Sequence, residues 1–184
     1  MRRFMHWLAT AATLTFVVPT QAGQKDPRLD GLFEDLRKAP TEEEAQPVEE
    51  KIWRVWLMSG NGSVDAEMLH GLHAMGKEDN EAALDAFTRA VTMQPDFAEG
   101  WNKRATVNYL LGRYDQSVID IQKTLELEPR HFGALSGLGL INLALGRDRQ
   151  ALAAFEAALK IHPHMPGADS HIRELREKFR GKGI

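Results

Sequence analysis

Residues 98–129, AEGWNKRATVNYLLGRYDQSVIDIQKTLELEP, set a pattern that the segments on both sides repeat. Pro95, Pro129 and Pro163 stand 34 residues apart, and the same offsets before each proline carry the same kind of residue. A small residue, a large apolar residue and a second small residue recur in that order: Ala83, Phe87 and Ala90; Ser117, Ile121 and Thr124; Ala151, Phe155 and Ala158. An earlier offset holds a further small residue, at Gly71, Ala105 and Gly139. A fixed period of this length predicts stacked helical units.

These offsets resemble the tetratricopeptide (TPR) repeat, in which each unit is a pair of antiparallel helices. The resemblance implies an all-α fold, a right-handed α-solenoid of three TPR helix pairs at residues 64–97, 98–131 and 132–165. One pair cannot bury its apolar face alone, so stacked pairs share a continuous core. The segments WNKRAT and PRHFGALSGLG also resemble those of exported bacterial TPR proteins of unassigned role.

The turn inside each repeat is marked by a glycine in two repeats only. Gly112 and Gly146 stand just past the first helix of their repeats, where a helix end favours glycine. In the first repeat Gly76 comes two residues early and Glu78 occupies the glycine position. The first repeat is therefore the most divergent of the three.

Residues 1–22 have the pattern of a secretory signal peptide. Arg2 and Arg3 precede an apolar run at residues 7–18, and small residues precede a cleavage point after Ala22. We expect cleavage there and a periplasmic or secreted product with no stable membrane anchor, although a retained anchor is the alternative. Removal of this segment leaves 21 basic and 26 acidic residues. The chain has no cysteine, which excludes disulfides and a lipidated N-terminal cysteine.

Residues 23–63 are expected to hold a helical pair, a degenerate repeat, followed by a linker. Apolar residues at helical spacing up to Leu36 predict the first helix. Thr41 and Glu44 form a capping box for the second, and Pro47 implies a kink or a start near Gln46. We expect this pair to cover the exposed end of the array, as terminal caps do. At the other end, the apolar stripe of Ile172, Leu175 and Phe179 predicts a capping helix within residues 166–184.

The resemblance implies a concave groove lined by the first helix of each repeat. The groove positions are Met68 and Leu72 in the first repeat; Asn102, Lys103, Thr106, Tyr109 and Leu110 in the second; and Gly133, Ser136, Gly137 and Leu140 in the third. The carboxylate clamp of chaperone-binding TPR proteins needs Lys, Asn and Arg at slots held here by Met68, Leu72, Lys103, Gly133 and Gly137. The remaining surface suits an amphipathic helix or an extended apolar peptide. Alternatively, Met68, Leu69 and Leu72 pack on the N-terminal helices.

Gly133 and Gly137 lie one helical turn apart, in the interior of a predicted helix. Each glycine costs about 1 kcal/mol relative to alanine there, so a compensating contact is expected. Close approach by a ligand and tight packing on a neighbouring helix both satisfy that requirement.

Other chemistries find little support in the sequence. The net charge of −3 gives no sign of nucleic-acid binding. His131, His162 and His164 fall at repeat junctions without ligand spacing, so we expect no metal and no cofactor. No nucleophile elbow, phosphate loop or zinc-protease motif is present, so no catalytic residue is predicted.

These features predict a non-enzymatic scaffold or adaptor of the bacterial cell envelope, a monomer or weak oligomer that binds a protein or peptide partner in its groove. The alternative is an accessory subunit that docks an envelope enzyme, or self-associates, without using the groove.

Overall fold

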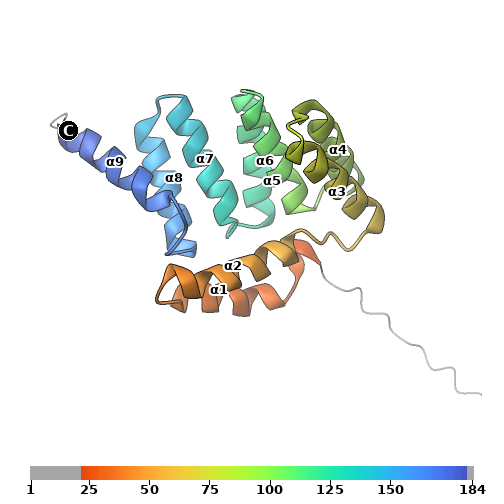
Figure 1. Ribbon diagram of the computed structural model, residues 1–184, viewed down its shortest axis with the longest axis horizontal. Coiled ribbons are helices and arrows are strands. Elements are labelled where there is room, and N and C mark those ends of the chain that lie inside the picture. The colour runs from red at the N-terminus through yellow and green to blue at the C-terminus, as the bar shows by residue number, and fades with distance from the viewer. Residues whose placement is uncertain (1–21, 182–184) are drawn as a thin grey trace, which may run out of the picture.

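A computed structural model describes residues 22–181, so the predicted signal peptide lies outside the described residues except for Ala22. All regular secondary structure in the described part is helical (Figure 1). The elements are a short 3-10 helix η1 (Gly23–Lys25) and the helices α1 (Arg28–Lys38), α2 (Glu42–Trp56), α3 (Gly62–Gly76), α4 (Asn80–Met93), α5 (Ala98–Leu110), α6 (Tyr114–Leu127), α7 (Phe132–Ala144), α8 (Asp148–Ile161) and α9 (Ala168–Gly181).

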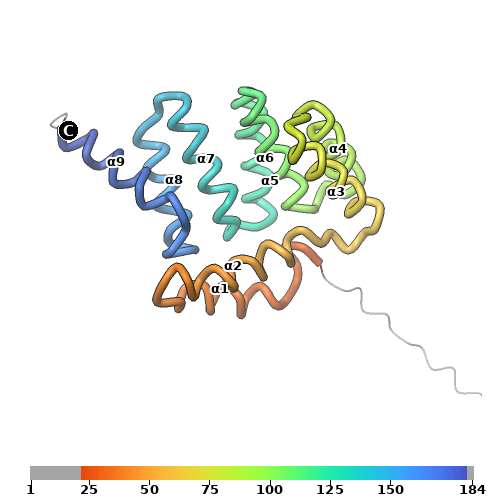
Figure 2. The backbone as a smooth tube through the Cα atoms, in the orientation of Figure 1, coloured from red at the N-terminus to blue at the C-terminus, as the bar shows by residue number. Residues whose placement is uncertain are grey.

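The pairs α3/α4, α5/α6 and α7/α8 stand side by side in chain order (Figure 2). They correspond to the three predicted repeats, which confirms the all-α solenoid. Helix α3 begins two residues before the expected boundary at residue 64, because Asn61 caps it. The Asn61 side chain accepts a hydrogen bond from the backbone N–H of Ser63.

The small positions of the repeat face the large apolar positions of the same repeat. A Cβ at Gly71 would lie 2.5 Å from Cε1 of Phe87, and one at Gly139 would lie 2.6 Å from Cε1 of Phe155. Both phenylalanines are fully buried. The two helices of a repeat can therefore approach closely only if this position carries no bulky side chain.

The turn residues follow the sequence pattern, including its exception. Gly112 and Gly146 have φ values of 71° and 67°, in the left-handed region that favours glycine. Glu78 has a φ of 61° and adopts the same turn without the freedom of glycine.

The predicted N-terminal helical pair forms as α1 and α2. Thr41 caps α2, because its Oγ1 accepts from the N–H of Glu44 at 3.3 Å. The suggested start near Gln46 is wrong, since α2 begins at Glu42 and continues through Pro47. Pro47 lies close to the start of α2 and is exposed, so the helix loses only the bond that this residue would have donated to Glu43.

The expected place of this pair, over the exposed end of the array, is wrong. Helices α1 and α2 lie along the edge of the array where the second helix of each repeat ends and the next first helix begins (Figure 1). Ile52 and Trp56 pack around Phe132, with Ile161 and Met165 at the border of that core. The apolar face of the pair is thus satisfied by the third repeat, not by α3. We call α1 and α2 together the hairpin.

The C-terminal helix occupies its predicted place. Ile172 and Leu175 of α9 are buried with Ala151 and Phe155 of α8, so α9 covers the last repeat. Across residues 22–181, no helix combines the length and apolar character needed to cross a bilayer.

Candidate functional site

A cavity of about 210 Å³ lies between α5 and α7, on the side of the array formed by first helices. Seven of the predicted groove residues line it: Asn102, Thr106, Tyr109, Gly133, Ser136, Gly137 and Leu140. They come from two helices that neighbour each other only because the repeats stack. The lining is completed by Ala105, Ser117, Ile121, Ile141 and Met165.

The cavity wall is apolar with neutral polar groups and carries no lysine or arginine. Thr106 donates its hydroxyl to the carbonyl of Asn102 at 3.0 Å, and the amide of Asn102 donates to Glu99. These polar groups are occupied by partners within their own helix. The arrangement can take up apolar side chains and offers no positive charge to a carboxylate.

The two glycines of α7 have different physical causes. A Cβ at Gly133 would lie 2.5 Å from Cη2 of Trp53 in the hairpin, so packing accounts for this glycine. A Cβ at Gly137 would meet only Cδ1 of Ile121, at 3.6 Å, which is an ordinary contact. Packing does not require a glycine at Gly137, whose bare backbone leaves room in the cavity.

Four predicted groove residues lie outside the cavity. Met68 is 2% exposed and belongs to the core of the first repeat with Val64 and Phe87. The prediction that Met68 lines the groove is therefore wrong. Leu72 is half-buried against that same core. Leu110 is exposed beyond the cavity. Leu69 is exposed as well, so the alternative prediction that it packs on the N-terminal helices is wrong.

Lys103, the fourth, is held by a buried carboxylate. Its Nζ lies 3.1 Å from Oε1 of Glu99 and 5.3 Å from the ring centroid of Trp53. Its charge is therefore directed to Glu99 and the hairpin, not to the cavity.

Glu99 is the centre of a buried polar network that the sequence analysis missed. Nδ1 of His131 accepts from the N–H of Ala134, so the ring proton sits on Nε2 and is donated to Glu99 Oε2 at 2.9 Å. Burial raises the pKa of Glu99, but the charge of Lys103 and the hydrogen bond from His131 more than offset this and leave it below its ordinary value. The one sequence signal was the spacing of Glu99 and Lys103, one helical turn apart.

The three junction histidines all hold the hairpin. The His131 ring stacks on Trp56, with centroids 4.1 Å apart. Nε2 of His162 lies 3.1 Å from Glu49 Oε2, and Nε2 of His164 donates to the carbonyl of Ala39 at 2.9 Å. Within residues 22–181, no group of three His, Asp or Glu side chains is placed to hold a metal ion.

The geometry is that of stacked helix pairs with a cavity between the first helices of the second and third repeats. A family model for the tetratricopeptide repeat matches residues 68–124 and 111–166, which together span more than half of the chain. The chain belongs to the tetratricopeptide repeat family. This TPR protein is 37% identical over 175 residues to a TPR repeat-containing protein of Rhizobium etli, an alignment that covers 94% of this chain and 86% of the relative.

Solved structures of TPR domains share the fold. The TPR domain of Sgt2 from Aspergillus fumigatus gives a TM-score of 0.63 at 18% identity, covering 67% of this chain and 83% of that one. The first TPR of Spaghetti (RPAP3), bound to an HSP90 peptide, gives 0.62 at 18% identity, covering 64% and 94%. Identities this low show the fold alone. TPR arrays are interaction modules whose stacked repeats form extended concave binding surfaces.

Proposed function

We propose that this TPR protein is a non-enzymatic interaction module of the bacterial cell envelope that holds an apolar segment of a partner protein in the cavity between α5 and α7. The cavity itself supports this most directly. Its volume of about 210 Å³ exceeds the roughly 150 Å³ that suffices to bind benzene in an engineered protein. One large apolar side chain of a partner fits this space.

The charge of the groove indicates what kind of segment it takes. The nearby cation Lys103 is paired with Glu99 outside the cavity, and no lysine or arginine of residues 22–181 lines the cavity itself. The HSP90 peptide bound by the first TPR of Spaghetti ends in an acidic sequence, SRMEEVD. An acidic terminus would find no counter-charge in the cavity described here, so we infer an apolar and uncharged contact.

The envelope location rests on residues 1–22, with Arg2, Arg3 and the apolar run that follows. Fractionation of cells that produce the chain with a tag at Ile184 tests it. A product shortened at Ala22 and released with the periplasm is expected. A full-length product in the cytosol would contradict the envelope role without bearing on the groove.

Partner capture tests the groove itself. We would use the tagged mature protein as bait in envelope extract, beside Gly137→Leu and Gly137→Ala. The alanine methyl fits at 3.6 Å from Ile121, so Gly137→Ala should retain the partner. A leucine there projects toward the cavity and should abolish capture while helicity is unchanged. Equal capture by the leucine variant would reject the groove and favour docking through another face, as expected of an accessory subunit.

A further inference from the structure

Helix α1 contains a glycine that no contact within the described part of the chain explains. Gly71, Gly133 and Gly139 each face an aromatic ring at 2.6 Å or less. Gly31 lies in the interior of α1, and no neighbouring atom of residues 22–181 lies within 4 Å of the position that its Cβ would take. Glycine destabilises a helix interior relative to alanine, so its presence favours a close approach from outside the chain.

Gly31 lies in the wall of an open, largely apolar groove on the hairpin, which has a volume of about 620 Å³. Four residues of α1 line it: Arg28, Gly31, Leu32 and Asp35. Their spacing of three, one and three residues places them on one face of the helix. The apolar part of this face is Leu32, which stays partly exposed.

Helix α2 presents a stripe with the same spacing. Lys51, Arg54, Val55 and Met58 line the other wall, Met58 lying just beyond the end of the helix. Val55 is buried in the floor, whereas Met58 is 47% exposed. Two parallel stripes of helical period form the kind of surface into which the ridge of a third helix packs.

The rim of this groove is basic. Lys51 and Arg54 have no carboxylate within 4 Å among residues 22–181, and Arg28 pairs with Asp26 while keeping 61% of its side chain exposed. Asp35 is the single acid in the lining. In a chain with a net charge of −3, this local excess of positive charge favours an acidic partner.

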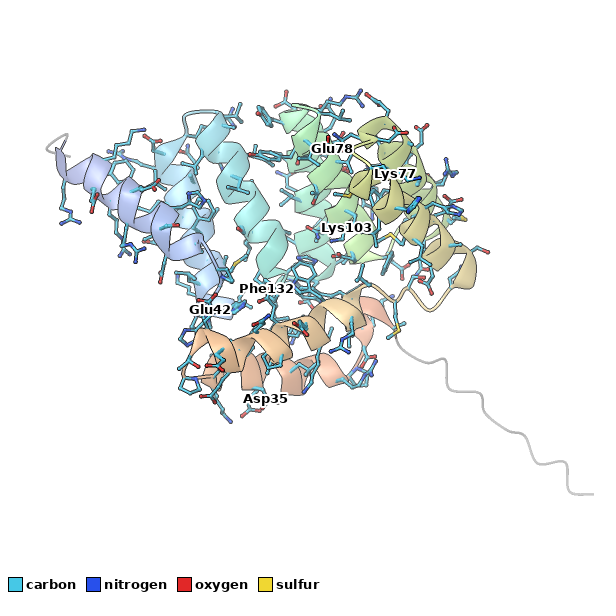
Figure 3. All side chains as sticks on the ribbon, in the orientation of Figure 1. Asp35, Glu42, Lys77, Glu78, Lys103 and Phe132 are labelled. Atoms are coloured by element: carbon cyan, nitrogen blue, oxygen red, sulfur yellow. The ribbon has the colours of Figure 1, made fainter. Side chains whose placement is uncertain are left out.

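The groove opens away from the array. Figure 3 shows Phe132 where α7 meets the hairpin and Asp35 on the opposite, outward side of the hairpin. No residue lines both this groove and the cavity between α5 and α7. The two surfaces can therefore be occupied independently.

We propose that the outward groove between α1 and α2 docks an amphipathic helix of a partner protein, with an apolar stripe flanked by aspartate and glutamate. The apolar stripe lies over Leu32, Val55 and Met58. Gly31 allows the backbone of the third helix to come close, and the flanking acids face Lys51 and Arg54. The site does not depend on the function proposed for the cavity between α5 and α7.

The probe is a fluorescent amphipathic peptide of about 20 residues, long enough to be helical in water, with leucine along one face and glutamate on both flanks. A control peptide carries lysine in place of every glutamate. Anisotropy titrations with the mature protein should show the acidic peptide binding at least about tenfold more tightly, as expected from several exposed ion pairs. Rising salt should reduce that difference. Equal affinity for the two peptides would overturn the proposal.

Gly31→Leu is the decisive variant. A Cβ at this position meets no neighbour among residues 22–181, so the hairpin should fold, yet the leucine side chain enters the groove and should weaken binding at least about tenfold. Lys51→Glu combined with Arg54→Glu should invert the preference between the peptides. Gly137→Leu is the matched control and should leave binding unchanged, which separates this site from the concave cavity. Loss with Gly137→Leu but not Gly31→Leu would place the peptide in the cavity and refute the outward site. Binding of anionic phosphatidylglycerol vesicles in preference to the acidic peptide, lost in Gly31→Leu, would replace the partner helix by a membrane surface.

Discussion

At the scale of single residues, Glu78 carries an avoidable backbone strain. Its φ of 61° places a side chain where the other two repeats use Gly112 and Gly146. The left-handed conformation costs a residue with a Cβ about 1 kcal/mol or more. Replacing that residue by glycine relieves this strain, but part of the gain is lost because glycine gives up more conformational entropy on folding. The strain is local, because Glu78 is exposed at the end of α3 remote from the hairpin (Figure 3).

We therefore expect Glu78→Gly to stabilise the protein by about 0.5–1 kcal/mol. Urea denaturation followed by circular dichroism measures this. Glu78→Ala removes the charge and keeps the strain, so it should show no such gain. A stabilisation of equal size in both variants would mean that charge, not backbone conformation, is responsible.

Glu49 links the hairpin to the third repeat through its charge. The hydrogen bond from His162 holds the pKa of Glu49 below its ordinary value, although burial acts in the opposite direction. A carboxyl whose pKa is lowered by folding stabilises the protein above its unfolded pKa of about 4.3. That stabilisation is lost as the pH falls through the lower, folded value.

Glu49→Gln should cost about 1 kcal/mol at pH 7, as expected for a hydrogen bond to a charged group that is partly screened by solvent. The difference from the natural chain should shrink toward zero as the pH falls from about 5 to 3. Urea midpoints at a series of pH values test it, with Glu43→Gln on the exposed face of α2 as the control. A difference that is constant with pH would show that the ionised carboxylate plays no part.

At the scale of elements, the contact between the two helices of a repeat sets the allowed side chains. A methyl at Gly139 would lie 2.6 Å from the buried Phe155 ring, whereas Ala105 occupies the equivalent position opposite the smaller Ile121. In the second repeat, the first helix thus carries a larger residue at this position, and the second helix carries a smaller residue opposite it. The sequence pattern identified these positions correctly, because both partners lie within one repeat.

Gly139→Ala should destabilise the protein by about 1–3 kcal/mol through overpacking. The same substitution at Gly31, whose added Cβ has no neighbour within 4 Å in the described part of the chain, should stabilise it by up to about 1 kcal/mol through helix propensity alone. Thermal unfolding of the two variants provides the comparison. If Gly139→Ala is as stable as the natural chain, α7 and α8 can separate without penalty and the close contact is not required.

At the scale of the whole molecule, the hairpin joins the two ends of the array. It leads directly into the first repeat, yet its apolar face packs on the third. Trp56 is 1% exposed and packs against the rings of His131 and Phe132, at centroid distances of 4.1 and 5.2 Å. This contact joins the hairpin to residues far away in the sequence, so its loss should release the hairpin as one unit.

Trp56→Ala should therefore cost about 3–5 kcal/mol in hairpin docking, the usual range for a buried tryptophan. Amide hydrogen exchange should become faster throughout α1 and α2 and near Phe132, with less change in α3 to α6. Trp101→Ala, which removes a more exposed tryptophan from α5, serves as control. Unchanged protection of α1 and α2 would show that other contacts suffice to hold the hairpin.

The sequence by itself determined the helix pairs, the glycine turns, the small-to-large contacts and seven of the residues around the concave cavity. These features repeat every 34 residues, and each one concerns neighbours within a repeat or between consecutive repeats. Only the tertiary structure decided where the hairpin docks and why Gly133 is a glycine. Those contacts join Trp53 and Trp56 of the hairpin to His131 and Gly133. The residues that they join lie neither within one repeat nor in consecutive repeats. An apolar stripe shows that a helix face must be buried, but because hydrophobic burial has no direction, the stripe does not specify the surface that buries it.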